Sequence, residues 1–245
     1  MPEVGRDFSV LVVEHEADAP AGWMGQHLEE LGVRLVVSRP YAGDVLPDDL
    51  GDHTGLLVLG GAMDSWDDAG SPWLPQTREL VRRAEGEGRP VLGICLGHQV
   101  ATLALGGDVG RNPAGSTVAV LPVSWGPEAA HDPLFGKACE ATHAVHWNND
   151  VVLRLPKGGQ VLATSPDGAV QAARIGRHVW GVQFHPEAHA AILESWVAGY
   201  GTDHEERGAD LERYLADARR WAPELEESCR FLARSFAALL HRGRP

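Results

Sequence analysis

One short stretch of the chain combines a potential nucleophile with the small residues that a sharp turn requires. Cys95 lies between Gly93 and Gly97, after an apolar run from Val91 to Ile94 and before a segment of helical character. In a tight strand-to-helix turn the central residue has a strained backbone, so its neighbours must be small. Such a nucleophile elbow would raise the Cys95 sulfur above a sheet edge, at a helix N-terminus that favours a thiolate. The alternative is a buried cysteine that packs as a small hydrophobic residue.

A second stretch offers the base that a cysteine nucleophile needs. An apolar strand from Val179 runs into His185, Pro186 ends the strand, and Glu187 follows two residues after the histidine. A carboxylate at this spacing can hold one imidazole nitrogen, which fixes the tautomer and leaves the other nitrogen for proton transfer. On its own, a His-x-Glu sequence is more typical of a surface or core histidine, so a role in catalysis depends on whether the fold brings His185 to Cys95.

A third stretch could stabilise the oxyanion that forms when a carbonyl is attacked. Gly60 and Gly61 directly follow an apolar strand from Leu56 to Leu59, where their backbone N–H groups can point at a ligand. The N–H of Leu96, the residue after the nucleophile, is a second candidate donor. An ordinary turn is the alternative interpretation of the glycine pair.

Together these stretches resemble the class I glutamine amidotransferases of the triad type. That family carries a Gly-x-Cys-x-Gly-His-Gln elbow and a downstream His-Pro-Glu, which here are residues 93–99 and 185–187. The resemblance covers about residues 8–200. It implies that Cys95 is the nucleophile, that His185 is general base and then general acid, and that Glu187 orients the imidazole.

The resemblance also implies where substrate would be held. It assigns the oxyanion donors to Gly61 and Leu96, and it adds further substrate-binding residues from three stretches of the chain: Gly60, Gln99, His146 and Asp150. The family usually has a Ser-His-Gly-Asp-like segment near the α-amino and α-carboxylate groups of glutamine. Here residues 146–150 keep the histidine and the aspartate, but Asn148 and Asn149 stand where a glycine is usual. Residues 60–74 resemble the stand-alone members similar to the amidotransferase domain of GMP synthetase.

The elements that must position these residues alternate between strand and helix. Apolar runs typical of fully buried strands alternate with segments of helical periodicity: strands at 8–13, 33–37, 56–59 and 91–94, and helices at 23–31 and 73–84. We therefore predict an α/β fold of the flavodoxin-like class I glutamine amidotransferase type, with a mostly parallel central sheet and helices on both faces.

The second half of the chain has shorter β runs and then becomes helical. The runs are bounded by Pro and Gly and are interpreted as hairpins that return to the sheet: 117–123, 144–146, 160–163, 169–174 and 179–183. Helices are expected at 190–197, 211–218 and 225–240. With no linker or repeat in sight, we predict one domain over residues 1–245, with a core at about 8–200 and a helical extension at about 205–242.

Composition limits the partners and the compartment. The chain has 34 acidic and 21 basic residues among 245, for a net charge of -13, whereas nucleic-acid and anionic membrane surfaces need clustered Lys and Arg. Its three cysteines are too few and too scattered for a disulfide framework or a zinc knuckle. The N-terminus lacks a basic region before its first apolar run. We predict a cytoplasmic protein without a nucleic-acid or membrane partner and without a cofactor.

A zinc site is the alternative use of the histidines. The pair His143 and His146 and the pair His185 and His189 have spacings that ligate zinc on a helix, but the first pair lies in β-like sequence, where that step points to opposite faces. We therefore predict no metal.

The implied activity is hydrolysis of the γ-glutamyl amide bond of glutamine, or of a γ-glutamyl amine or peptide, through a γ-glutamyl thioester on Cys95. Two alternatives stay open: a glutaminase subunit that supplies ammonia to a separate synthetase, and a catalytically silent binding scaffold. The acidic residues Asp64, Asp67 and Asp68 could attract a cationic amine at the pocket mouth.

Overall fold

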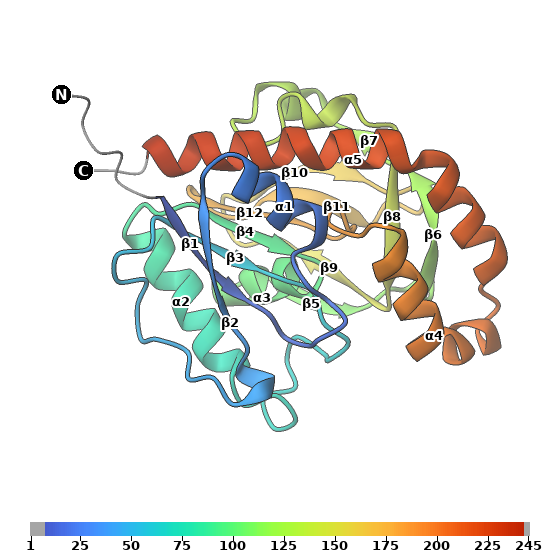
Figure 1. Cartoon of the computed structure of the whole chain (residues 1–245), viewed down its shortest axis with the longest axis horizontal. Helices are drawn as coiled ribbons and strands as arrows, with labels where there is room; N and C mark the ends of the chain where they lie inside the picture. The colour runs from blue at the N-terminus through green and yellow to red at the C-terminus, as the bar shows by residue number, and fades with distance from the viewer. Residues whose placement is uncertain (1–7, 243–245) are drawn as a thin grey trace.

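An eight-stranded sheet forms the centre of the computed structural model, which describes residues 8–242 (Figure 1). Its strands lie in the order β2-β1-β3-β4-β12-β11-β10-β7, with bounds β1 Ser9–Val13, β2 Arg34–Ser38, β3 Gly55–Val58, β4 Val91–Ile94, β7 Ser124–Trp125, β10 Gln160–Thr164, β11 Val170–Arg174 and β12 Val179–Val182. Strands β2, β1, β3, β4 and β12 pair in parallel, and the remaining three pair antiparallel. The predicted mostly parallel sheet is therefore confirmed.

The apolar runs of the sequence form the middle of this sheet. Every residue of β1, β3, β4 and β12 is buried, as expected for parallel strands that are covered on both faces. Because the carboxyl ends of parallel strands meet at one edge, the loops after β1, β3, β4 and β12 come together there.

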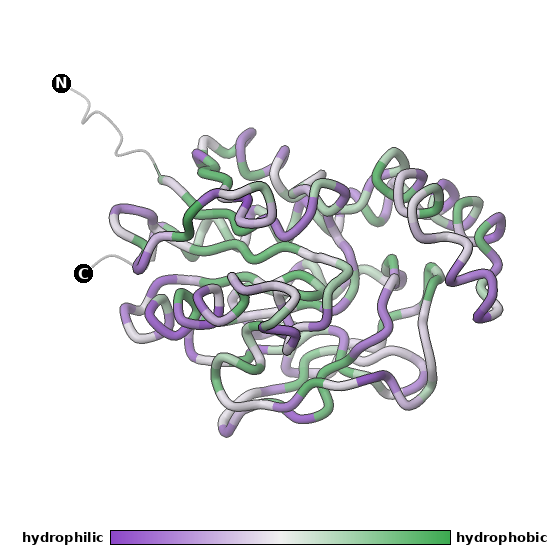
Figure 2. The backbone as a smooth tube through the Cα atoms, turned by 90° about the horizontal axis from the view of Figure 1, so that it is seen from below, coloured by the Kyte–Doolittle hydropathy of each residue, from purple (hydrophilic) through white to green (hydrophobic). Residues whose placement is uncertain are grey.

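Helices cover both faces of the sheet. On one face, α1 (Gly22–Glu30) and α5 (Leu211–Arg242) bury side chains against β1, β3 and β4 in a single apolar cluster. On the other face, α2 (Leu74–Gly86) and α3 (Leu96–Ala104) form a second cluster with the opposite sides of the same strands. Figure 2 shows hydrophobic segments running through the centre of the molecule between these layers.

The C-terminal region consists of two helices, where the sequence predicted three. Helix α4 spans Ala190–Glu206, nine residues beyond its predicted end, and α5 continues through Pro223. Proline removes one hydrogen bond from a helix and bends it, at a cost of about 3 kcal/mol. Helix α5 bends accordingly (Figure 1), and its C-terminal part buries Cys229, Leu232 and Phe236 on the sheet. This burial explains why one helix continues through Pro223, where the sequence pattern predicted two.

Two small antiparallel sheets complete the fold. Strand β5 (Asp108–Arg111) pairs with β9 (Asp150–Arg154), and β6 (Thr117–Pro122) pairs with β8 (His143–Asn148). The expectation that all the short β runs return to the main sheet was wrong for β6 and β8, which pair with each other. The sequence did not predict β5 or β9 at all. Three short 3₁₀ turns lie at Pro40–Ala42, Pro127–His131 and Ala138–Glu140.

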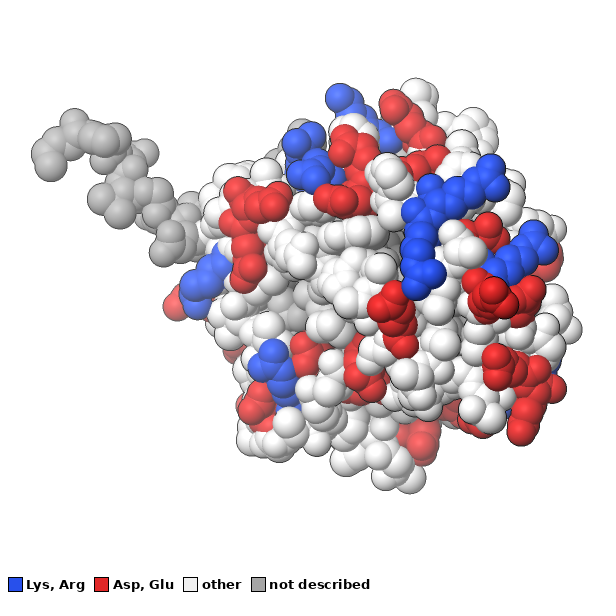
Figure 3. Space-filling view, turned by 45° about the vertical axis from the view of Figure 1, so that its right-hand side comes forward, with Lys and Arg blue, Asp and Glu red and all other residues white. Residues whose placement is uncertain are grey.

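The surface mixes both signs of charge. Acidic and basic side chains are interspersed on the face shown in Figure 3, with neither sign collected into one continuous patch. Within residues 8–242, none of the helices has the length and apolar character that crossing a bilayer requires.

Candidate active site

The turn between β4 and α3 holds Cys95 in a strained conformation. Its φ of 49° makes it the one non-glycine residue with positive φ in the part of the chain that the structure describes. The two glycines leave the space that this turn needs: a Cβ on Gly93 would overlap the Gly97 carbonyl, and a Cβ on Gly97 would overlap the Val58 carbonyl of β3. Strain of this kind, held by the surrounding structure, is typical of functional sites.

His185 and Glu187 form a buried pair after β12. The Nδ1 atom of His185 lies 2.7 Å from Oε1 of Glu187, and both side chains are almost fully buried. Burial by itself lowers the pKa of His185, but the charges of Glu187 and Cys95 and the hydrogen bonds with both raise this pKa well above its usual value. Because Glu187 occupies Nδ1, the Nε2 atom is the one left for proton transfer; it lies 3.4 Å from the Trp147 carbonyl oxygen.

The adjacent strands β3, β4 and β12 bring the three chemical elements together. A Cβ built on Gly60 would lie 3.4 Å from Cε1 of His185 and 3.9 Å from Cβ of Cys95. Gly60 therefore lies beside both the candidate nucleophile and the candidate base. A larger residue at this position would press on both side chains.

Near Cys95, neither the Gly61 N–H nor the Leu96 N–H has a hydrogen-bond partner within residues 8–242. The two residues are neighbours, since a Cβ on Gly61 would lie 2.9 Å from Cδ2 of Leu96.

Behind the glycine pair, the Trp73 indole N–H donates to Nδ1 of the fully buried His15 at 2.9 Å. Burial lowers the pKa of His15 to about 3, so the ring stays neutral and supports the loop.

A chain of side-chain amides connects Cys95 to β9. The Nε2 group of Gln183 donates to the Cys95 sulfur at 3.4 Å. Its Oε1 accepts a hydrogen bond from Gln99 at 3.2 Å, and Gln99 also donates to the Asp150 carbonyl at 3.2 Å. Sequence analysis assigned no role to Gln183. Its signal was a polar residue that follows an apolar strand, directly before Phe184 and His185.

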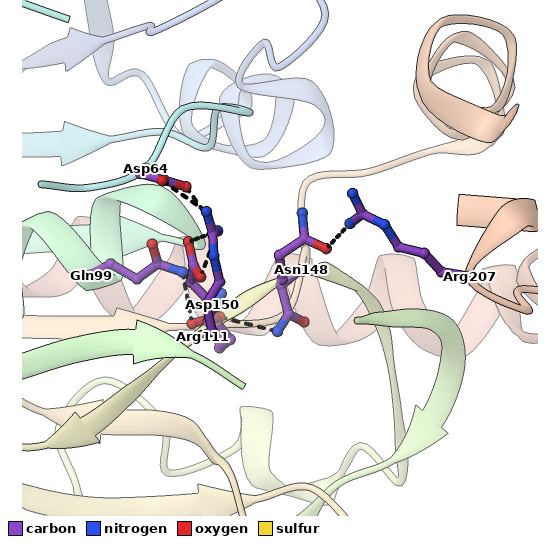
Figure 4. A network of polar contacts seen from close by, with 8 residues as sticks. Asp64, Gln99, Arg111, Asn148, Asp150 and Arg207 are labelled. Carbon is purple, nitrogen blue, oxygen red and sulfur yellow. Dashed lines mark hydrogen bonds and ion pairs between the residues drawn. The ribbon is translucent and has the colours of Figure 1, made fainter. Parts of the chain in front are cut away.

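An open pocket of about 220 Å³ lies above these groups and is lined by Cys95, His185, Gly61, Gln99 and Asp150. At one end of the pocket, Arg111 binds two carboxylates, as Figure 4 shows. Its two terminal nitrogens each donate to one oxygen of Asp64 at 2.8 Å, and Nη1 also donates to both oxygens of Asp150, at 2.9 and 3.0 Å. Arg111 was missed by sequence analysis, which did not identify β5.

The segment with the two asparagines adopts a different arrangement from the one that the resemblance implied. His146 is fully buried and is absent from the pocket lining, because it alternates with Trp147 along β8. Burial, reinforced by the charge of His185, lowers the pKa of His146 to about 4. Asn148 donates to the Asp150 carbonyl at 3.1 Å (Figure 4). Asn149 accepts a hydrogen bond from Arg207 at 3.0 Å.

Helix α4 and the turn after it supply a wall of the pocket that sequence analysis missed. The wall consists of Trp196, Tyr200, Asp203, His204 and Arg207. Their spacing places them on one face of a helix, a signal that was present in the sequence. The Trp196 ring packs against the His185 ring, with centroids 4.6 Å apart. This wall therefore lies on the imidazole side of the site.

The histidines considered as zinc ligands have other contacts. His143 stacks on Trp221 with ring centroids 3.7 Å apart, and His189 packs edge-on against Trp23. In the described part of the chain, no group of three His, Cys, Asp or Glu side chains has an arrangement that could hold a metal ion.

Comparison with known proteins agrees with this geometry. A family model, described as glutamine amidotransferase class-I, matches residues 22–194, which is more than half of the chain. The chain belongs to this family. In this class I glutamine amidotransferase, the pocket wall formed by α4 and the turn after it, residues 196–207, lies outside the region that the family model matches.

Its relatives include both large synthases and smaller proteins. A GMP synthase (glutamine-hydrolyzing) of Aeropyrum pernix is 30% identical over 218 residues, which are 85% of this chain and 40% of that protein. Gamma-glutamyl peptidase 5 of Arabidopsis thaliana is 30% identical over 60% of this chain and 59% of its own length. A glutamine amidotransferase-like protein of Salmonella typhimurium is 28% identical over 85% of this chain and 88% of its own length. The chain thus spans less than half of the GMP synthases that it matches.

Solved structures share the fold over nearly the whole chain. A glutamine amidotransferase from Thermotoga maritima superposes with a TM-score of 0.83 at 23% identity, covering 95% of this chain and 99% of that one. The overall architecture, including the C-terminal helices, is therefore shared with a protein of low sequence identity.

Proposed function

We propose that this class I glutamine amidotransferase hydrolyses the γ-glutamyl amide bond of glutamine, or of a γ-glutamyl amine or peptide, with Cys95, His185 and Glu187 as its triad. The observation that carries the proposal is the strained Cys95 beside an imidazole whose other nitrogen lies 2.7 Å from a buried carboxylate. This combination is what nucleophilic catalysis by cysteine requires. A silent scaffold would not need the strain.

The first half of the reaction forms a thioester. The Cys95 thiolate attacks the side-chain carbonyl carbon, and the π electron pair moves onto the carbonyl oxygen, which accepts hydrogen bonds from the N–H groups of Gly61 and Leu96. When this pair returns, the C–N bond breaks and His185 Nε2 gives its proton to the departing nitrogen. The products are a free amine, or ammonia from glutamine, and a γ-glutamyl thioester.

The second half releases glutamate. His185, now neutral, takes a proton from water as the water oxygen bonds to the thioester carbon. Collapse of this intermediate breaks the C–S bond and returns the Cys95 thiolate. Glu187 holds the ring in one tautomer and stabilises the imidazolium in both halves. The hydrogen bonds of Gln183 and Gln99 hold the Cys95 sulfur in a fixed position relative to Asp150.

The shape of the pocket supports a leaving group larger than ammonia. Beside His185, where the leaving nitrogen must be protonated, the pocket continues along Trp196 and Tyr200. The acidic residues of the 64–68 loop contribute less to this end than the sequence suggested. Asp64 is paired with Arg111, and Asp68 is paired with Arg78 at 2.6 Å. These pairs weaken the case for a strongly cationic amine.

Ammonia supply to a separate synthetase is the second candidate. It is favoured by the GMP synthase of Aeropyrum pernix, whose similarity extends over 85% of this chain. In that case the isolated chain would release little glutamate, and a second subunit would raise the rate.

Glutamate release by the purified chain tests these readings. Glutamine and a panel of γ-glutamyl amines and dipeptides are the substrates, Cys95→Ala is the inactive variant, and Cys139→Ala is a matched control at a cysteine outside the pocket. We expect turnover that Cys95→Ala abolishes and Cys139→Ala retains. Turnover that survives Cys95→Ala would contradict the role of Cys95 as nucleophile. No turnover of any member of the panel by the folded chain would contradict stand-alone hydrolysis.

A further inference from the structure

We propose that Arg111 binds the α-carboxylate of the γ-glutamyl group and so selects γ-glutamyl compounds over other amides. This inference rests on the proposed function and assigns one end of the same pocket. Its basis is the position of Arg111, its unused donors and the charges around it.

The two ends of the pocket can be assigned to the two parts of the substrate. The leaving nitrogen must lie at His185 Nε2, and the Trp196 ring packs against that imidazole. The wall formed by α4 is therefore the leaving-group end. The amide chain of Gln183 and Gln99 approaches the Cys95 sulfur and leads to Asp150. That end of the pocket is left for the glutamyl chain.

Arg111 is the cation at the glutamyl end. It is the last residue of β5 and pairs directly with Asp150, the first residue of β9, in the β5–β9 sheet. The other arginine of the pocket, Arg207, donates to Asn149, and Figure 4 shows the two arginines on opposite sides of Asn148. A carboxylate at the far end of a glutamyl chain would therefore meet Arg111.

The guanidinium of Arg111 has donors to spare. An arginine side chain has five N–H groups, of which two are on each terminal nitrogen. Nη1 donates to Asp64 and Asp150, whereas Nη2 donates to Asp64 alone. One N–H on Nη2 and the N–H on Nε have no partner within residues 8–242. Two adjacent donors of one guanidinium are the arrangement that binds a carboxylate in bidentate fashion.

The two aspartates give the same site a partner for the α-ammonium group. Arg111 supplies one positive charge against two negative charges, so the cluster has one carboxylate in excess. Burial raises the pKa of Asp150, and Arg111 only partly opposes this effect. An ammonium group beside Asp150 would stabilise its charged form. The cluster thus matches both charged groups on the α-carbon of a γ-glutamyl compound, the carboxylate and the ammonium. Amides that lack these two groups would not be held.

A cycle of two substrates and two proteins tests the assignment. L-γ-glutamyl-p-nitroanilide is compared with 4-aminobutanoyl-p-nitroanilide, which lacks only the α-carboxylate. Loss of a charge-assisted hydrogen bond should lower kcat/KM about 10- to 100-fold. We expect Arg111→Ala to lower kcat/KM for the γ-glutamyl substrate about 10- to 100-fold more than for the second substrate, because only the first has a carboxylate to lose.

A purely structural clasp gives a different result. If Arg111 only ties the Asp64 loop to β9, Arg111→Ala lowers kcat/KM equally for both substrates, and the inference is wrong. Arg154→Ala is the matched control, because Arg154 pairs with Asp108 in the same small sheet but lies outside the pocket. It should leave both substrates unaffected. If Arg111→Ala does not fold, Arg111→Lys serves in the cycle, because it keeps a charge but loses the bidentate geometry.

Binding separates this inference from the proposed reaction. Calorimetry of L-glutamine with Cys95→Ala requires no turnover. We expect the Kd to rise about 10- to 100-fold when Arg111→Ala is added. This result would support the assignment even if the wild-type chain hydrolysed nothing. Unchanged affinity, or no binding of glutamine to Cys95→Ala, would overturn the assignment even if hydrolysis were observed.

Discussion

Replacing Glu187 by Gln removes one charge from the site and keeps the shape of the side chain. The wild-type carboxylate contacts His185 Nδ1 through Oε1 at 2.7 Å, while its Oε2 is buried without a partner among the described residues. The substitution therefore affects one hydrogen bond and one charge. If the new amide oxygen accepts from Nδ1, the loss of a charge-assisted bond of about 1.5–3 kcal/mol lowers kcat/KM about 10- to 150-fold. If the amide NH₂ faces Nδ1 and forces the other tautomer, the loss approaches about 10⁴-fold.

The same change should alter the pH dependence. The charge of Glu187 raises the pKa of His185 against burial, so this pKa should fall in Glu187→Gln. A raised pKa contributes stability that is fully present below the unfolded value of about 6.5 and is lost as pH rises through the folded value. The stability difference between wild type and variant should therefore be larger at pH 6 than at pH 9.

The assay is kcat/KM for glutamate release across pH, with an NMR titration of the His185 ring. Glu224→Gln is the matched control, because Glu224 accepts hydrogen bonds from Thr142 and from the His143 N–H outside the pocket. A Glu187→Gln enzyme within twofold of wild type, with an unchanged His185 titration, would refute the role given to Glu187.

Two further predictions concern the folded state. Gly97→Ala should lower the free energy of unfolding by about 2–3 kcal/mol in chemical denaturation, because its Cβ would overlap a backbone carbonyl of β3. Gly86→Ala, at the last residue of α2 where a Cβ would meet open space, should instead raise it by up to about 0.5 kcal/mol; a loss as large as that of Gly97→Ala would contradict the packing of the elbow. Burial lowers the pKa of His15 and His98 to about 3 and that of His146 to about 4. Their unfolded values lie near 6.5, so stability should be present above pH 6.5 and fall by about 1.4 kcal/mol per pH unit per histidine as pH drops to 5. A flat profile from pH 7 to 5 would exclude these buried neutral rings.

The sequence predicted the elements whose signals are local. A few consecutive residues were enough to recognise the apolar runs of β1, β3, β4 and β12 and the glycines around Cys95. Their alternation with helices was enough to place the ends of three strands at one edge. That edge is where Gly60, Cys95 and His185 meet.

The rest of the site depends on pairings that no local pattern specifies. Strand β5 is four residues long and its side chains are only partly buried, so nothing before the fold marks Arg111 as a neighbour of Asp150. His146 was assigned to the substrate by position in a motif, but strand alternation turns it into the core. The sequence predicted separate helices at 211–218 and 225–240 where α5 is continuous, because the cost of Pro223 between them is local whereas the burial that offsets it is on the sheet.

Detection of the acyl-enzyme tests the central claim most directly. The purified chain is mixed with the best substrate of the panel, quenched in acid within the first turnover and analysed by intact-protein and peptide mass spectrometry. The triad account predicts a γ-glutamyl adduct on the peptide that contains Cys95, with accumulation before steady-state glutamate release and no adduct in Cys95→Ala. Glutamate release without an adduct at Cys95, or an adduct at Cys139 or Cys229 instead, would contradict it.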